Sequence, residues 1–130
     1  MKKFPPSSVT EKLLEMYKSD IQEAKDWYVR DAPTYDKYTL YDIGEWLKDS
    51  DDPNYLSESV RWFDMAAEQG NIHAHYQLGE MYLLDDNMGG DYTVALKHLS
   101  IVAVDDTSYS YVLKSQYLLG LMYYYGLGTD

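Results

Sequence analysis

The sequence predicts an all-α fold, a short α-solenoid of antiparallel helix pairs with about six helices. A pattern of residues recurs along the chain at a spacing of about 35, which is typical of repeat architectures. Within each copy the recurring residues are three, four, five or eight positions apart, as they are on one face of an α-helix. No alternating run of β-branched residues indicates a strand.

The recurring pattern has two parts, and each part occurs three times. The first part places small residues around a tryptophan, and the second places a glycine after a large apolar residue. The copies of the first part are Ala24, Trp27 and Ala32; Ser59, Trp62 and Ala67; and Ala95, His98 and Ala103. The copies of the second part are Thr39, Ile43, Gly44 and Leu47; Ala74, Leu78, Gly79 and Tyr82; and Ser115, Leu119, Gly120 and Tyr123.

The repeated glycines predict where helices cross. A glycine inside a helix costs about 1 kcal/mol relative to alanine, so its recurrence indicates that a neighbouring helix approaches closely. We therefore expect Gly44, Gly79 and Gly120 at helix crossings. Trp27 and Trp62 hold equivalent positions in the pattern, and we expect both to be buried.

Proline, glycine and capping residues set the expected helix ends. The first helix should stop before Pro33, Asn54 can cap a later helix, and Gly70 follows the end of that helix. Helices are expected at about residues 8–30, 35–48, 55–69, 72–85, 91–104 and 109–125. At this length we expect one domain, made of an N-terminal helical cap (1–33), two repeats (34–71 and 72–107) and a C-terminal half repeat (108–130).

The best-preserved copies resemble a known family. Ala74-His75-Tyr76-Gln77-Leu78-Gly79-Glu80-Met81-Tyr82 and Trp62-Phe63-Asp64-Met65-Ala66-Ala67-Glu68-Gln69-Gly70 are similar to the two helices of the Sel-one-like repeat, a relative of the tetratricopeptide repeat. The resemblance covers roughly residues 20–130. It implies a right-handed solenoid that binds other proteins, with the first helix of each repeat lining a concave face. Thr39, Leu47 and His98 depart from the family pattern.

Charge is distributed unevenly along the chain, whose net charge is −11. Residues 1–37 hold seven basic and seven acidic residues, whereas residues 38–130 hold four basic and fifteen acidic ones. Nucleic acid is a poor partner for such a chain, because phosphate binding requires clustered cations. A basic protein is a suitable partner, since a field of one sign attracts the opposite charge. The alternative is that the charge only maintains solubility.

The sequence does not indicate a catalytic site, a metal site or a membrane-spanning segment. The chain has no cysteine, and we recognise no set of nucleophile, base and acid, so we expect neither an enzyme nor a cofactor. His73 and His75 are two positions apart, whereas ligands on one helix face need a spacing of three or four. His98 stands at the tryptophan position, which favours packing. No apolar run approaches the ~20 residues of a membrane span, and the simplest expected location is the cytoplasm.

The helical register, with the resemblance, predicts the binding surface. Tyrosines three positions before each repeat glycine, and carboxylates one position after the first two glycines, should line the concave groove. Aromatic side chains with flanking carboxylates suit protein recognition, although some of the 15 tyrosines can equally serve packing. The candidate partner-binding residues are Tyr38, Tyr41, Glu45, Asp49, Tyr76, Glu80, Leu84, Tyr117, Tyr124 and Tyr125.

The last predicted helix is unusually apolar for the end of a solenoid, where a polar outer face is needed. It reads Tyr117-Leu118-Leu119-Gly120-Leu121-Met122-Tyr123-Tyr124-Tyr125. One interpretation is that it caps the preceding pair, with tyrosine hydroxyls in water. The other is that part of it is buried against another chain, for which self-association through this half repeat is one route.

Two classes of function remain. A small, acidic chain without catalytic groups resembles the immunity proteins that bacteria keep against toxins, so a basic toxin domain is the first expected partner. The alternative is an adaptor or scaffold in a signalling or quality-control complex, the general role of Sel-one-like repeats. Scaffolds usually carry longer arrays, and this chain has fewer than three full repeats, which favours the inhibitor.

Overall fold

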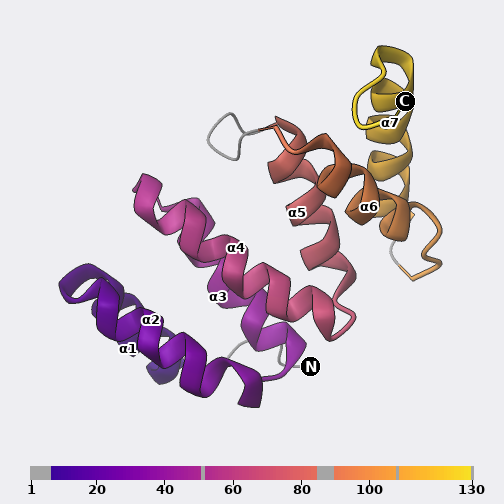
Figure 1. The fold of residues 1–130 in the computed structure, drawn as a ribbon. Helices are drawn as coiled ribbons and strands as arrows, with labels where there is room; N and C mark the ends of the chain where they lie inside the picture. Colours follow the sequence, from indigo (N-terminus) through magenta and orange to yellow (C-terminus); the bar gives the residue numbers. More distant parts are fainter. Residues whose placement is uncertain (1–6, 51, 85–89, 108, 130) are drawn as a thin grey trace. The chain divides into compact units, whose positions relative to one another are not determined.

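The computed structural model describes residues 7–50, 52–84, 90–107 and 109–129, and within these ranges the chain is helical, with no strand (Figure 1). The expected all-α fold class is confirmed. The helices are α1 (Ser7–Ser19), α2 (Ile21–Asp31), a 3-10 helix (Ala32–Thr34), α3 (Lys37–Asp49), α4 (Pro53–Glu68), α5 (Ile72–Leu84), α6 (Tyr92–Ala103) and α7 (Tyr109–Tyr125).

The expectation of one helix over residues 8–30 is wrong, because Asp20 divides this segment into α1 and α2. Asp20 has extended backbone angles (φ −154°, ψ 91°), and its carboxylate accepts hydrogen bonds from the backbone N–H groups of Gln22 and Glu23, each at 3.1 Å. Aspartate is a favoured N-cap because its side chain satisfies these otherwise unpaired donors. A new helix therefore starts here.

The cap of α4 also differs from the expectation. Asp52, and not Asn54, is its N-cap, with its carboxylate accepting the N–H of Asn54 at 2.9 Å. Pro53 occupies the first helical position, where the missing N–H and the fixed φ of proline fit the helix. At the other end, the left-handed glycine Gly70 (φ 91°) follows the helix as expected.

The chain forms two compact units, residues 1–71 and 72–130, and the boundary falls where the first full repeat was expected to end. In the first unit, α3 packs against α4 and α1 against α2. Trp62 and Phe63 of α4 are both fully buried. A methyl group added at Gly44 of α3 would lie 2.8 Å from the Phe63 ring, so the glycine makes this close packing possible.

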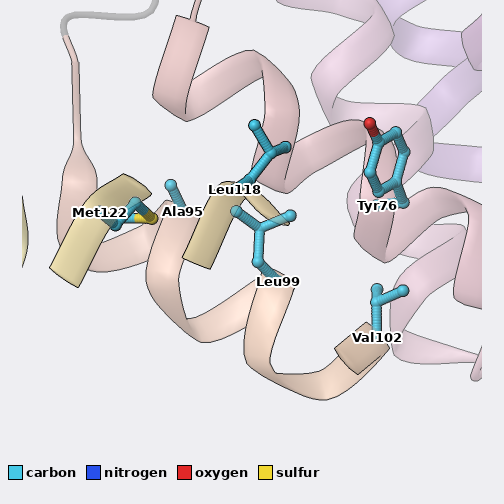
Figure 2. Close-up of a cluster of buried hydrophobic side chains, with 6 residues drawn as sticks. All are labelled: Tyr76, Ala95, Leu99, Val102, Leu118 and Met122. Atoms are coloured by element: carbon cyan, nitrogen blue, oxygen red, sulfur yellow. The ribbon is translucent and has the colours of Figure 1, made fainter. Parts of the chain in front are cut away.

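The second unit packs α6 against both α5 and α7. Figure 2 shows its core of six buried side chains, Tyr76 from α5, Ala95, Leu99 and Val102 from α6, and Leu118 and Met122 from α7. Gly79 repeats the role of Gly44, because a methyl group there would lie 2.6 Å from the Leu99 side chain.

Gly120 does not lie at a helix crossing, contrary to the expectation. It is exposed, and a methyl group added there would find no atom within 4 Å. Among the described residues no helix follows α7. The chain instead turns back at Gly126 (φ 71°), where the N–H of Leu127 donates to the Met122 carbonyl at 2.8 Å. This is the hydrogen bond of a Schellman helix end.

The two glycine environments make a direct test of the repeat packing. Gly79→Leu should overpack the contact with Leu99 and lower the free energy of unfolding by ~1–3 kcal/mol. Gly120→Leu is the matched control, since its side chain meets open space and should not destabilise the monomer. Urea denaturation followed by circular dichroism at low micromolar protein measures both. Equal stability of Gly79→Leu and the wild type would remove the packing role of the glycine.

Candidate protein-binding surface

The first helices of the two full repeats carry the same pair of hydrogen-bonded side chains. On α3, the hydroxyl of Tyr41 donates to Oε2 of Glu45 at 3.0 Å. On α5, the hydroxyl of Tyr76 donates to Oε2 of Glu80 at 2.9 Å. Each pair joins residues four positions apart, which are neighbours on a helix face. The repeat therefore preserves an arrangement of two side chains as well as a fold.

The rings of these tyrosines do not form the exposed series that the spacing suggested. Tyr41 and Tyr76 are only 6% and 5% exposed, and the Tyr41 ring packs 5.5 Å from that of Phe63. Burial, together with the hydrogen bond to Glu80, raises the pKa of Tyr76, so its hydroxyl stays protonated and continues to donate. Both tyrosines therefore pack in the interior with their rings, and their hydroxyls orient the carboxylates of Glu45 and Glu80.

The two oriented carboxylates are candidates to bind a cation of another protein. Glu45 and Glu80 are half-buried, and in the part of the chain that the structure describes neither has a Lys, Arg or His nitrogen within 4.0 Å. A carboxylate that is already fixed in direction loses less entropy on binding. Partial desolvation also strengthens its charge-assisted hydrogen bonds.

The third copy of the pair is different. Its tyrosine, Tyr117 on α7, is 67% exposed, and Leu121 stands where the first two copies have glutamate. Tyr124 and Tyr125, at the end of the same helix, are 81% and 66% exposed. These three side chains are accessible, but they carry no carboxylate, so their surface is apolar and aromatic instead of acidic.

The remaining candidate residues lie at the ends of α3 and α5. Tyr38 is partly exposed, and the Lys37 ammonium lies 5.5 Å from the centre of its ring. Asp49 is the exposed last residue of α3, and Leu84 is the exposed last residue of α5. Partner binding by these residues stays a prediction.

A buried polar network in the first unit was not predicted from the sequence. Glu58 of α4 is 4% exposed and accepts the Tyr17 hydroxyl at 2.9 Å. The same hydroxyl accepts the indole N–H of Trp62 at 2.9 Å, and Arg61 donates to Glu58 at 3.4 Å. The two hydrogen bonds of Tyr17 join α1 to α4 and span 41 and 45 residues, so no local spacing signals them.

A pair of histidines in the second unit also escaped sequence reasoning. His75 of α5 and His98 of α6 have their Nδ1 atoms 2.9 Å apart. Burial, and to a lesser extent the charges of His75 and Lys97, lowers the pKa of His98 to about 4. The repeat alignment could have indicated that His75 faces the interior, because it places His75 at the position of Leu40, a fully buried residue. Within the described ranges, no three His, Asp or Glu residues form a group that could hold a metal.

Comparison with known families decides the relationship of the chain. The model of the Sel1 repeat matches residues 39–71, 72–101 and 113–130, which is more than half of the chain. The chain belongs to the Sel1 repeat family. We found no significant match to a curated protein or to a solved structure.

Membership of the Sel1 repeat family implies a helical solenoid and a role in protein–protein interaction. Sel1 repeat proteins are generally binding modules without catalytic activity. The first match begins at Thr39, and the last covers α7 from Leu113 onward with its closing turn. Both Tyr–Glu pairs therefore lie inside matched repeats, as do the exposed Tyr117, Tyr124 and Tyr125. None of the described helices has the length and apolar character needed to cross a membrane.

Proposed function

We propose that this chain is a non-catalytic inhibitor of the immunity type, which binds and neutralises a basic toxin domain. The observation that carries the proposal is the hydrogen-bonded Tyr–Glu pair present in both full repeats, Tyr41–Glu45 and Tyr76–Glu80. Each pair offers an oriented carboxylate to the cationic side chain of another protein.

The charge of the repeats supports a basic partner. The fifteen acidic residues against four basic ones in residues 38–130 create a negative field that accelerates encounter with a positive surface. Because salt screens such a field over ~8 Å at physiological ionic strength, association should slow as salt is added. The same field opposes the binding of nucleic acid.

Inhibition would follow from where the cations of the toxin are held. Its Lys or Arg head groups would pair with Glu45 and Glu80, while their aliphatic stems cover apolar surface beside them. A toxin domain that binds RNA, DNA or another anion uses cations for that purpose. Engaging these cations would cover the active site of the toxin without any chemistry in the inhibitor.

An adaptor is the second candidate function. The exposed tyrosines of α7, Tyr117, Tyr124 and Tyr125, favour it, because they provide a surface of different chemistry from that of the two acidic pairs. An adaptor needs two such surfaces to bridge two partners, whereas an inhibitor needs one.

Binding by charge-reversed variants tests the function. The wild-type chain, used as bait in an extract of its native cells, should retain one stoichiometric basic protein that inhibits growth when expressed alone. Glu45→Lys/Glu80→Lys should weaken binding of that purified protein at least tenfold and abolish protection. Glu11→Lys/Glu15→Lys is the matched control, since it makes the same change in charge at two exposed positions of α1 and should reduce the on-rate only modestly.

A second pair of variants separates orientation from charge. Tyr41→Phe/Tyr76→Phe keeps the net charge and the buried rings but removes both hydroxyls, and it should weaken binding by about 3–10-fold, in line with the loss of ordinary hydrogen bonds. An equal loss for both charge-reversed proteins would show that only the overall field matters. Retention of several non-toxic proteins in place of one toxin would favour the adaptor.

A further inference from the structure

One face of α7 is apolar, aromatic and open. Tyr109, Leu113, Tyr117 and Tyr124 are 77%, 48%, 67% and 81% exposed, and with Gly120 they fall within about 80° of arc on the helix. We call these five residues the α7 stripe. It lies opposite the side of α7 that carries Ser115, Leu118 and Met122, which are buried. A continuous exposed stripe of this kind marks an interaction surface.

The two full repeats show what covers the equivalent positions. Gly44 lies against Phe63 of the following helix, and Gly79 lies against Leu99 of the following helix, whereas Gly120 has no atom near an added methyl group. The tyrosine three positions earlier behaves in the same way. It is 6% and 5% exposed in the two full repeats and 67% exposed in α7. Two positions of the stripe therefore match residues that a helix covers elsewhere in the chain.

We propose that the α7 stripe is covered by the α7 stripe of a second copy of this chain, in an antiparallel pair about a two-fold axis near Tyr117, the middle of the stripe. This inference goes beyond the proposed function and does not depend on a toxin being the partner. The absence of a side chain at Gly120 lets the two helix axes approach closely. With the axis there, Leu113 of one copy lies opposite Gly120 of the other. Tyr109 of one copy lies opposite Tyr124 of the other in the same way.

Charge favours a second copy as the occupant. All 22 acidic residues of the chain lie outside α7, whose one charged residue is Lys114. Two copies of a chain with a net charge of −11 repel each other through most of their surface, because like charges facing one another oppose association. The stripe carries no carboxylate, so it is a surface on which two copies can meet without that repulsion. A two-fold contact also uses one patch on both copies.

The size of the stripe predicts a weak dimer. A helix of the 17 residues of α7 is about 25 Å long, and one helix pair buries less than the ~800 Å² per partner of a standard interface. We therefore expect a dissociation constant on the order of 10–100 μM. The chain is then a monomer at low micromolar concentration and a dimer at high local concentration.

Sedimentation equilibrium of the full chain between about 1 and 500 μM tests the dimer. The wild type should pass from monomer to dimer with rising concentration. Leu113→Glu places a carboxylate in the stripe, and Gly120→Leu separates the helix axes, so each should weaken association at least tenfold. Val29→Glu is the matched control, because Val29 of α2 is also apolar and exposed, at 68%, and it should associate like the wild type.

Circular dichroism at low micromolar protein confirms that each variant is folded before its association is compared. A wild type that stays monomeric over the whole range would overturn the proposal and leave the stripe to a helix of another protein. Association of both stripe variants with the wild-type constant would also overturn it, by placing the contact elsewhere. Monomer–dimer exchange that is lost in the stripe variants and kept in Val29→Glu is the expected result.

Discussion

Replacing Trp62 with alanine should lower the free energy of unfolding by about 3–5 kcal/mol, the usual loss for a large aromatic side chain in a core. Trp62 is fully buried. The ring of Tyr28 meets it edge-on at 4.9 Å between ring centres, and that of Tyr35 stacks at 6.5 Å. The truncation would leave a cavity that these rings cannot collapse to fill.

Part of the loss comes from the polar network. The indole N–H donates to the Tyr17 hydroxyl, which in turn donates to the buried carboxylate of Glu58. Burial of the phenol, with the charge of Glu58, raises the pKa of Tyr17, so the hydroxyl remains a donor. Without Trp62 the oxygen of this hydroxyl loses its donor in a buried site, which costs about 1–3 kcal/mol for an unsatisfied group.

Trp46→Ala is the matched control, because the Trp46 side chain on α3 is 39% exposed. It should change the free energy of unfolding by less than ~1 kcal/mol. Urea denaturation followed by circular dichroism suits both variants, since removing a tryptophan alters the fluorescence itself. Similar losses for the two variants would contradict the assignment of Trp62 as the core residue of the first unit.

The helices and their pairing could be predicted because the information is local and repeated. Three copies of one spacing fix the face of each helix, and a residue such as Gly79 keeps its role when its neighbours change. The break at Asp20 escaped prediction because the residues on both sides favour helix. Only the backbone hydrogen bonds of the Asp20 carboxylate distinguish a cap from a helical aspartate. Trp62 is buried as expected, while Trp27 is only partly buried.

The candidate surface was predictable in its residues but not in their arrangement. The repeat register selected Tyr41, Glu45, Tyr76 and Glu80, and the spacing of four within each pair was already visible. The burial of the Tyr41 and Tyr76 rings could not be predicted, because it depends on Phe63 for Tyr41 and on the packing of α6 and α7 for Tyr76. Tyr117 shows the same point in reverse. Its register matches that of Tyr76, yet its burial depends on what packs against it.

The buried histidine pair predicts a loss of stability in mild acid. His98 has a pKa of about 4 in the folded chain against an ordinary value of 6.5. Between these pH values, His98 is therefore protonated in the unfolded chain and neutral in the folded chain. The contribution of neutral His98 to the free energy of unfolding is therefore fully present above pH 6.5, and it is lost as the pH drops toward 4. The full loss is on the order of 3 kcal/mol, and about 2 kcal/mol of it should appear between pH 7 and pH 5.

A variant without the titrating group isolates this contribution from that of the many carboxylates. The amide of His98→Asn can approach His75 as Nδ1 does but does not titrate, so the fall in stability between pH 7 and pH 5 should be about 2 kcal/mol smaller than in the wild type. His73→Asn is the comparison variant, because His73 is the exposed histidine of α5 and the variant keeps both members of the His75–His98 contact.

The comparison depends on the slope with pH and not on the absolute stability, which the exchange of a buried ring for a smaller amide will itself reduce. Urea denaturation of the three proteins at half-unit intervals from pH 5 to pH 7 gives these slopes. Parallel curves for the wild type and His98→Asn would mean that His98 protonates in the folded chain, with room for water beside the ring. A flatter curve for His73→Asn than for His98→Asn would transfer the acid sensitivity to the surface histidine.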